Sequence, residues 1–302
     1  MRIFLATAED PPSFENTLKL LEKPNLLMSY YYLRKKIRDK KKMHDFLREA
    51  AGHSSKLFLD SGAHTFIVQN NLKKYAQGHT VTKTDDPVKY YEEYRDWLKE
   101  FSIYFDYIAE LDVGECPGVG YPMIKMWRKE LDAMGLHDKL IIVSHYHHFS
   151  RIFPNWWEEW ERMLDEYHYV AIGDDPPEKI LDKHFKIWID KGRKNFIHGF
   201  AETKIWKMQR YPYYSVDSTS WHIGARFGTV LLYRRPPDMG MSTWAVDRQN
   251  TKKCYEKFCT SVYPKMEPAA RSYPIKDFWD YTRGNYFRCF QNALAFQALE
   301  AD

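Results

Sequence analysis

The sequence predicts an α/β protein built on a closed (β/α)8 barrel of the TIM type. Short apolar runs alternate with helical segments, a pattern that favours parallel strands joined by crossover helices. Eight such runs occur before residue 234, and eight units close a barrel. Polar, glycine and histidine residues gather after the runs, where barrels build their sites.

The first strand, at residues 2–6, is followed by an unusually long excursion that we interpret as a helical insertion, with helices at 15–22 and 28–51. Residues 70–85 are polar and are expected to form a loop before the next helix. The eight strands are expected at residues 2–6, 57–60, 107–113, 140–143, 169–172, 195–198, 213–216 and 227–233.

Helix boundaries are indicated by their terminal residues. Pro87 stands near the first position of a helix at 86–100, and Gly135 ends a helix at 121–134. Gly192, beside Lys and Arg, ends a helix at 178–191. Further helices are expected at 156–167 and as a short segment ending at 210.

The pattern changes after the last predicted strand. Pro236-Pro237 marks a break, and helices are expected at 250–262 and 277–299. We therefore expect a catalytic barrel domain over 1–234 and a helical carboxyl-terminal extension over 235–302 that packs on it. No internal repeat is evident.

The composition of the chain limits the kinds of partner and the compartment that we expect. The net charge of +4 fits a nucleic-acid partner without requiring one, and the 22 Tyr and 10 Trp provide rings that can stack on bases. Four cysteines in 302 residues argue against a disulfide scaffold and for a reducing, cytoplasmic compartment. The amino-terminal apolar run is too short for a signal peptide, and no run approaches membrane-spanning length, so no membrane partner is expected.

Three predicted strands end on an aspartate: Asp60, Asp112 and Asp217. Burial of a carboxylate is unfavourable, so a carboxylate at the end of a buried strand is expected to form an ion pair, to accept hydrogen bonds or to take part in catalysis. The first and eighth predicted strands separate Asp60 from Asp217 around the closing seam, and the two side chains are expected to face each other across the barrel mouth. In such a pair, one carboxylate can attack an anomeric carbon while the other transfers a proton. The alternative is that each aspartate only caps a helix or anchors a strand.

Histidines follow the fourth predicted strand at His145, His147 and His148, and His198 ends the sixth. With the aspartates they could bind a catalytic metal, as in a barrel hydrolase. A neutral His145 that hydrogen-bonds a flat heterocycle is the interpretation we adopt, with a surface role for His148 and no metal in the site.

Cysteines and glycines leave two further alternatives open. Gly173 and Gly199 each follow a strand directly, which suits close approach of a planar ligand or a tight turn. Cys254, Cys259 and Cys289 could ligate a structural zinc, although their spacing is loose and no fourth ligand is evident; no cofactor is required. Walker and Rossmann phosphate loops and a Ser-His-Asp arrangement are absent from the sequence.

A dense basic run follows three tyrosines at 30–32. Seven of the nine residues from Arg34 to Lys42 are Lys or Arg. A solvated helix face is one interpretation, and a surface for a phosphate backbone is the other. The residues expected to bind nucleic acid are Arg34, Lys35, Lys36, Lys40, Lys41 and Lys42.

The segments Leu59-Asp60-Ser-Gly-Ala and Ser215-Val-Asp217-Ser resemble the tRNA-guanine transglycosylase superfamily, most closely its DNA-acting branch, the DpdA-type DNA 7-deazaguanine transglycosylases of phages and bacteria. The resemblance covers the barrel, from about residue 3 to 233. It departs from the tRNA enzymes at Ala63-His64, where they have glycine and an aromatic residue, and it lacks their Cys-x-Cys-x2-Cys zinc motif.

The resemblance implies a reaction and a set of roles. Asp217 would attack C1′ of a guanosine nucleotide, guanine would leave, and a preQ0-like 7-deazaguanine deprotonated by Asp60 would enter. Asp112 would recognise the base edge, and Gly173 would contribute backbone contacts. Substrate-binding positions are expected at Ser61, Gly62, His64, Asp112, His145, Gly173, His198, Gly199, Phe200 and Trp221, with the rings of His64, Phe66, Phe200 and Trp221 near a flipped-out nucleotide.

The expected partners are DNA and a 7-deazaguanine base, in the host cytoplasm if the chain is phage-encoded. Three alternatives remain open: a transglycosylase-like enzyme that acts on tRNA, a metal-dependent hydrolase of barrel type, and a barrel that binds nucleic acid without catalysis.

Overall fold

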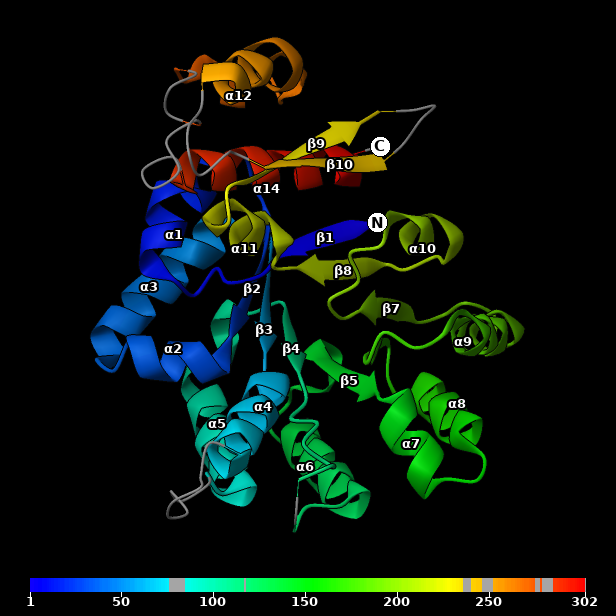
Figure 1. Ribbon diagram of the computed structural model, residues 1–302. Coiled ribbons are helices and arrows are strands. Elements are labelled where there is room, and N and C mark those ends of the chain that lie inside the picture. The colour runs from blue at the N-terminus through cyan, green and yellow to red at the C-terminus, as the bar shows by residue number, and fades with distance from the viewer. Residues whose placement is uncertain are drawn as a thin grey trace. The chain divides into compact units, whose positions relative to one another are not determined.

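The computed structural model describes residues 1–75, 85–116, 118–235, 240–245, 252–274, 278 and 285–301. Eight strands form a closed barrel in which the order around the barrel follows the order along the chain, and Figure 1 shows the helices that alternate with them. The predicted fold class is confirmed. The strands are β1 (Arg2–Leu5), β2 (Asn25–Ser29), β3 (Lys56–Asp60), β4 (Tyr107–Ala109), β5 (Leu140–Ser144), β6 (Tyr169–Ile172), β7 (Phe196–Gly199) and β8 (Ser215–Ser218).

Neighbouring strands of the barrel pair in parallel wherever a register is defined. In β1, Phe4 is the register partner of Asp217 in β8 and of Asn25 in β2. Strand β5 is buried along its whole length, as expected for parallel strands that are covered on both faces. Parallel pairing brings the residues that follow neighbouring strands to the same end of the sheet.

Two of the strand assignments made from sequence are wrong. Residues 25–29 form β2, which was assigned in part to a helix, while residues 229–234 form β9 (Thr229–Arg234) outside the barrel. Strand β9 pairs antiparallel with β10 (Gly240–Ala245) in a separate two-stranded sheet. The total of eight was right because one missed strand replaced one wrongly included.

The segment between β1 and β2 contains the helix α1 (Pro11–Asn16) and the 3-10 turn η1 (Leu18–Leu20), in place of the predicted helix at 15–22. The predicted loop at 70–85 is wrong in its first part, because α4 continues to residue 75; residues 76–84 lie outside the described part of the chain.

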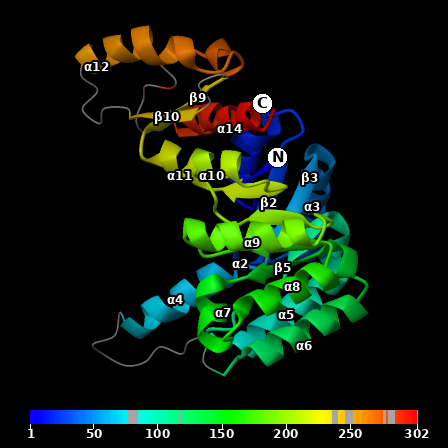
Figure 2. The same ribbon diagram turned by 90° about the vertical axis from the view of Figure 1, so that its right-hand side faces the viewer.

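The helices predicted at 86–100, 121–134, 156–167 and 178–191 are confirmed to within one residue at their starts. The single helix predicted at 28–51 is wrong, because this segment is divided into the end of β2 and two separate helices. Asp86 caps α5 by accepting from the Val88 amide, with Pro87 at the first helical position, and Asp39 caps α3 by accepting from the Lys42 amide. Helices α8 and α9 lie side by side (Figure 2). The helices are α2 (Tyr30–Lys36), α3 (Lys40–His53), α4 (Ala63–Tyr75), α5 (Pro87–Phe101), α6 (Tyr121–Ala133), α7 (Tyr146–Ile152), α8 (Trp156–Glu166) and α9 (Glu178–Asp190), with 3-10 turns η2 (Ser102–Tyr104) and η3 (His137–Lys139).

The carboxyl-terminal helix is held by buried polar side chains. Asn292 accepts from the Leu231 amide at 2.6 Å and donates to the carbonyls of Trp221 and Thr229. Arg288, fully buried, donates to the Ala225 carbonyl. The elements after β7 are α10 (Ile205–Arg210), α11 (Ser220–Arg226), α12 (Lys252–Lys257), the π-helical turn η4 (Phe258–Val262), the 3-10 turns η5 (Tyr263–Lys265) and η6 (Ala270–Ser272), and α14 (Asn285–Ala301).

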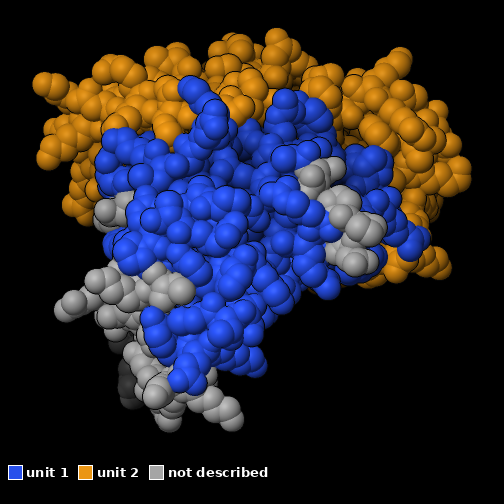
Figure 3. All heavy atoms as spheres, turned by 90° about the horizontal axis from the view of Figure 1, so that it is seen from above, with its two compact units in different colours: residues 1–26, 201–302 blue, residues 27–200 orange. Residues whose placement is uncertain are grey.

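The chain divides into two compact units, residues 1–26 with 201–302 (unit 1) and residues 27–200 (unit 2), which are coloured in Figure 3. The proposed domain boundary at residue 234 remains a prediction. None of the helices in the described ranges combines the length and apolar character needed to cross a membrane.

Candidate functional site

In unit 2, Asp60 is the last residue of β3 and is followed by a tight turn. Gly62 has φ +78°, and a Cβ there would lie 2.5 Å from Cβ of Tyr31, so only glycine fits. Tyr90 donates its hydroxyl to the Ser61 carbonyl at 2.7 Å. The Ser61 hydroxyl is buried and has no hydrogen-bond partner among the described residues. The turn is therefore rigid, which holds Asp60 at a defined strand end.

In unit 1, Asp217 lies in β8 and its residue is only 7% exposed. Its Oδ1 accepts a hydrogen bond of 2.8 Å from the backbone amide of Ala201. Ala201 has φ +52°, a conformation that a residue with a Cβ adopts at a cost. The Ala201 amide thus fixes the orientation of the Asp217 carboxylate, and strained backbone of this kind often accompanies a functional site.

A second group in unit 2 joins the ends of β4, β5 and β6. The Nε2 of His145 contacts Oδ2 of Asp112, and its Nδ1 lies 2.9 Å from Oδ1 of Asp174. Burial disfavours the charged imidazole, but the two carboxylates outweigh it and raise the pKa of His145 well above its usual range. The expectation of a neutral His145 is therefore wrong, because both ring nitrogens act as donors to carboxylates.

The contacts of His145 also bear on the alternative of a metal-dependent hydrolase. A histidine binds a metal through a deprotonated ring nitrogen, and neither nitrogen of His145 is available while Asp112 and Asp174 hold them. His147 is exposed on α7. Among the described residues, no three His, Cys, Asp or Glu side chains are grouped so as to hold a metal ion. The donor set of this cluster favours an ion-pair network.

Gly173 leaves room for His145. A Cβ at position 173 would lie 2.8 Å from Cε1 of the imidazole. The Gly173 amide donates to the Ser144 carbonyl at 3.0 Å, as part of the pairing between β5 and β6. This amide is therefore not open to a ligand, and the expected amide contact from Gly173 to a base is not supported.

Two phenylalanine rings pack on His198, which is fully buried near the end of β7. Phe58 lies 5.1 Å from His198 and Phe200 lies 4.6 Å from it, between ring centroids. Gly199 pairs with Ile172 in β6. Phe200 is half-buried, so one part of this aromatic cluster reaches the surface of unit 2.

The other rings expected near a nucleotide differ in accessibility. Phe66 is 1% exposed and packs on Tyr90, with 4.6 Å between ring centroids. Trp221 is fully buried, and its Nε1 donates to the Ala6 carbonyl at 2.9 Å. Neither ring has a face open to a base in this structure, so their expected roles in stacking are not supported. His64 is exposed at the start of α4 and is available.

The basic run at 34–42 is divided between helices α2 and α3. Some of its side chains form ion pairs, and others are exposed to solvent. Arg34 pairs with Glu93 at 2.6 Å, and Lys40 pairs with Glu100 at 2.7 Å. The remaining cations at Lys35, Lys36, Lys41 and Lys42 are exposed. Lys35 lies 3.6 Å from the Tyr31 ring centroid and Lys36 lies 5.8 Å from that of Tyr32. Part of the run is thus engaged within the protein, and part faces solvent.

The cysteines give no support to a structural zinc. Cys289 is 1% exposed, and burial raises the pKa of its thiol to about 12, which disfavours the thiolate that zinc requires. Cys259 is half-buried in the π-helical turn. The side chain of Cys254 lies outside the described residues. Neither Cys259 nor Cys289 forms a disulfide with a described residue.

Sequence reasoning missed a buried ion pair beside Asp112. Glu110, 2% exposed, forms a bidentate pair with Arg128 and also accepts from the Val143 amide at 2.7 Å. Burial raises the pKa of Glu110. Removing one partner of such a pair leaves an uncompensated charge, which typically costs about 3–5 kcal/mol. The pair fixes the end of β4 against β5.

Sequence reasoning also missed Asp174 and the hydrogen bond from the Ala201 amide to Asp217, although the resemblance places the segment 199–201 in the lining of the pocket. Asp174 stands two residues after the fifth predicted strand, among the polar residues that gather after strand ends, so the sequence contained a signal for it. No local signal marks Ala201, because its role depends on a hydrogen bond to a residue on another element.

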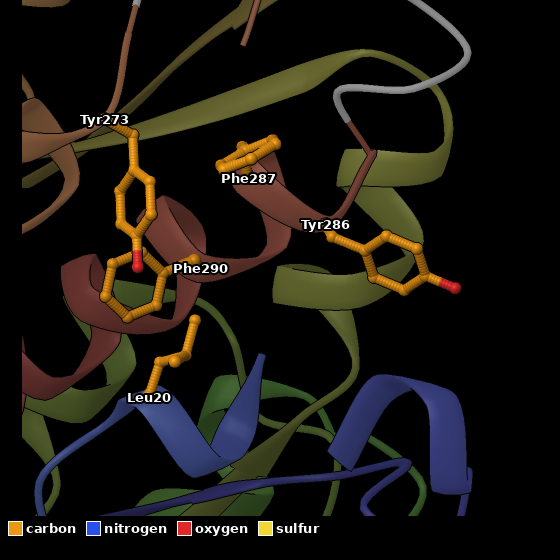
Figure 4. A pocket seen from close by; sticks show the side chains of 5 residues that line it. All are labelled: Leu20, Tyr273, Tyr286, Phe287 and Phe290. Atoms are coloured by element: carbon orange, nitrogen blue, oxygen red, sulfur yellow. The ribbon is translucent and has the colours of Figure 1, made fainter. Parts of the chain in front are cut away.

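A separate apolar pocket of about 350 Å³ occurs in unit 1. Figure 4 shows the side chains that line it, which come from η1, residue 273 and α14. Its described lining side chains include no carboxylate, imidazole or cation, so they do not supply the groups needed for nucleophilic or acid–base catalysis. Its lining residues are Leu20, Tyr273, Tyr286, Phe287 and Phe290.

Comparison of the chain with protein-family models finds no match, and comparison with curated proteins finds none either.

Proposed function

We propose that the protein is a glycosyltransferase that exchanges guanine in a polynucleotide, with DNA as the favoured acceptor, for a 7-deazaguanine base. The observation that carries the proposal is the Asp217 carboxylate, which is nearly buried at a barrel strand end and oriented by the Ala201 amide. A nucleophilic carboxylate needs a fixed approach to its target carbon, because correct orientation supplies much of the rate enhancement.

In the proposed reaction, an oxygen of Asp217 attacks C1′ of the nucleotide. The bond from C1′ to N9 of guanine breaks, and its electron pair goes to N9, which takes a proton from the Asp60 carboxylic acid. The resulting Asp60 carboxylate then removes the proton from N9 of the incoming base, and that nitrogen attacks C1′ and releases Asp217. Two displacements at C1′ retain its configuration, and no phosphodiester bond is broken.

The strand-end position of Asp60 supports its assigned role. Asp60 is half-exposed and follows directly on a buried strand, so its carboxyl group remains accessible for proton transfer. The rigid turn at Ser61 and Gly62 limits its movement.

The cations at Lys35, Lys36, Lys41 and Lys42 support a polynucleotide as the acceptor, because they are exposed and clustered on two successive helices. The missing tRNA-type zinc motif favours DNA over tRNA.

The proposal is tested by incubating the protein with DNA or tRNA that carries radiolabelled guanine, together with unlabelled 7-deazaguanine bases. We expect release of labelled guanine from DNA and a covalent protein–DNA adduct that survives denaturing electrophoresis. Asp217→Asn should abolish the adduct and lower exchange by about 10⁴-fold or more. Asp60→Asn should lower exchange by about 10²- to 10⁴-fold.

Asp165→Asn is a matched control, since Asp165 is an exposed aspartate paired with Lys191. It should leave exchange within about twofold of the unaltered protein. Undiminished exchange in Asp217→Asn contradicts the proposed nucleophile, and exchange on tRNA but not DNA contradicts the proposed acceptor.

A further inference from the structure

The ends of β4, β5 and β6 contribute one residue each to a group of three contacting side chains, Asp112, His145 and Asp174. Asp112 follows β4, His145 follows β5, and Asp174 follows β6. Because β5 pairs in parallel with both β4 and β6, the three side chains reach the same end of the sheet. Each ring nitrogen of His145 contacts a different carboxylate.

This geometry specifies the protonation of the group. An ionised carboxylate only accepts hydrogen bonds, and a neutral imidazole has only one N–H. Two carboxylates on opposite sides of one ring therefore require an imidazolium. Two carboxylates and one imidazolium carry a net charge of −1.

The backbone at residues 174 and 175, beside this group, adopts a strained conformation. Asp174 has φ +68° and Asp175 has φ +43°, so two successive residues with side chains lie in the left-handed region. Residues that carry a Cβ adopt this region at a cost in free energy. The bond from Asp174 to His145 compensates for part of this cost. Gly173 makes the arrangement possible, since any larger residue would displace the imidazole.

The carboxylates remain accessible while the imidazole holds them. The side chain of Asp112 is 17% exposed and that of Asp174 is 30% exposed. In each case the imidazole contacts one carboxylate oxygen, Oδ2 of Asp112 and Oδ1 of Asp174. The second oxygen of each is the acceptor that the group can offer to a ligand.

We propose that His145 is a positioning residue that holds Asp112 and Asp174 as paired acceptors for the edge of a planar heterocycle with adjacent N–H donors, such as the N1–H and exocyclic amine of guanine. This inference rests on the proposed function and assigns the base-recognition group within it. Without the imidazolium, two neighbouring carboxylates repel and one takes up a proton, which turns an acceptor into a donor. His145 therefore determines which base edge the group accepts.

The test compares His145→Gln with His147→Gln, an exposed histidine on α7, the helix that begins directly after His145, by calorimetric binding of free guanine and hypoxanthine, which lacks the exocyclic amine. The unaltered protein and His147→Gln should prefer guanine. His145→Gln should weaken guanine binding by about 10- to 100-fold and lose most of the preference. In the exchange assay, KM for the base should rise with little change in kcat.

A readout that needs no ligand is the nitrogen NMR spectrum of the histidine rings. Both nitrogens of His145 should be protonated at neutral pH, and Asp112→Asn and Asp174→Asn should each lower the pH at which the ring titrates. Other charged groups around the cluster, whose own titrations must be assigned in the same spectra, are His147, His148, Arg151, Glu115 and the pair of Glu110 and Arg128.

A neutral His145 ring at pH 7, or unchanged guanine affinity and base preference in His145→Gln, overturns the inference. Loss of guanine binding in His145→Gln, in a protein that performs no exchange, refutes the proposed reaction and leaves the positioning role intact. Failure of the unaltered protein to bind guanine, with exchange intact, refutes the positioning role alone.

Discussion

The protonation of His184 is controlled by its burial. It is fully buried in α9, its Nδ1 donates to the Ile180 carbonyl at 2.9 Å, and Trp156 and Trp160 pack on its ring. With Nδ1 as the donor, Nε2 is the acceptor for the Ser144 hydroxyl at 3.3 Å. Burial lowers the pKa of His184 to about 4 from its ordinary value of 6.5.

The lowered pKa of His184 predicts a loss of stability in acid. Above pH 6.5 the ring is neutral in both folded and unfolded chains, and the full stability is present. Between pH 6.5 and about 4 only the unfolded chain takes up the proton, so the free energy of unfolding falls as the pH falls. The loss from this group is on the order of 3 kcal/mol.

Urea denaturation at pH 7.5 and pH 4.5 measures this effect. His184→Gln should lower stability at pH 7.5 but show a smaller further loss in acid than the unaltered protein. His137→Gln, with a half-exposed side chain, is the control and should retain the full acid-induced loss. An equal acid-induced loss in His184→Gln contradicts the prediction.

At the scale of the element, helix α3 begins with three lysines at 40–42. Cations at a helix amino-terminus oppose the macrodipole, so these residues are unfavourable for the helix that contains them. Asp39 caps the helix and Glu100 pairs with Lys40, whereas Lys41 and Lys42 form no ion pair with a described residue. Their placement is explained if they contact phosphates.

This placement predicts effects of opposite sign in the double variant Lys41→Gln with Lys42→Gln. Stability should rise by about 0.3–1 kcal/mol for each lysine removed, because an unfavourable charge is lost. The slope of log affinity for duplex DNA against log salt should become shallower by about 0.9 for each lysine removed. Denaturation and binding titrations at several salt concentrations measure the two effects.

Lys186→Gln is the matched control, since Lys186 is an exposed lysine paired with Asp190 on α9. It should leave the salt slope unchanged. A slope that is unaltered in the double variant removes the start of α3 from the interface.

Helix α14 predicts a second effect at the element scale. Asn292→Ala should lower the free energy of unfolding by about 3 kcal/mol, because the Leu231 amide and the carbonyls of Trp221 and Thr229 lose a buried partner. Gln297→Ala is the control, since Gln297 makes a single exposed hydrogen bond, and it should change stability by less than about 0.5 kcal/mol. Equal effects of the two variants, measured by urea denaturation, contradict the assigned role of Asn292.

At the scale of the whole molecule, closure of the barrel depends on β1. This strand pairs with β2 on one side and with β8 on the other, and Phe4 at its centre is fully buried. Because a closed barrel has no edge strand, each strand supports two neighbours. Phe4 is also the register partner of Asp217, which links strand packing to the candidate nucleophile.

Phe4→Ala should therefore destabilise the protein by about 3–5 kcal/mol and reduce base exchange through displacement of β8. Ile103→Ala, at a position that is 71% exposed, should change stability by less than about 0.5 kcal/mol. Chemical denaturation followed by circular dichroism measures both. A loss below about 1 kcal/mol in Phe4→Ala is inconsistent with a central role for β1 in the packing.

Local patterns in the sequence determined much of the fold. The apolar run that ends on Asp60 predicted the end of β3, because a strand buried on both faces needs a continuous apolar stretch. The run before Asp217 predicted β8, although this strand continues through Asp217 to Ser218. Strand β2 was missed because its five residues pass into α2 without a turn residue between them. Strand β9 was assigned to the barrel because an apolar run does not specify its partner.

The tertiary structure alone decided the state of the candidate site. The charge of His145 depends on Asp112 and Asp174, which the chain brings to it from two other strands. The burial of Trp221 and Phe66, and the hydrogen bond from Ala201 to Asp217, likewise depend on residues distant in sequence. The sequence by itself determined which residue types stand at the strand ends, because strand periodicity is local. Their protonation, accessibility and orientation arise from burial and from long-range contacts, which exist only once the chain has folded.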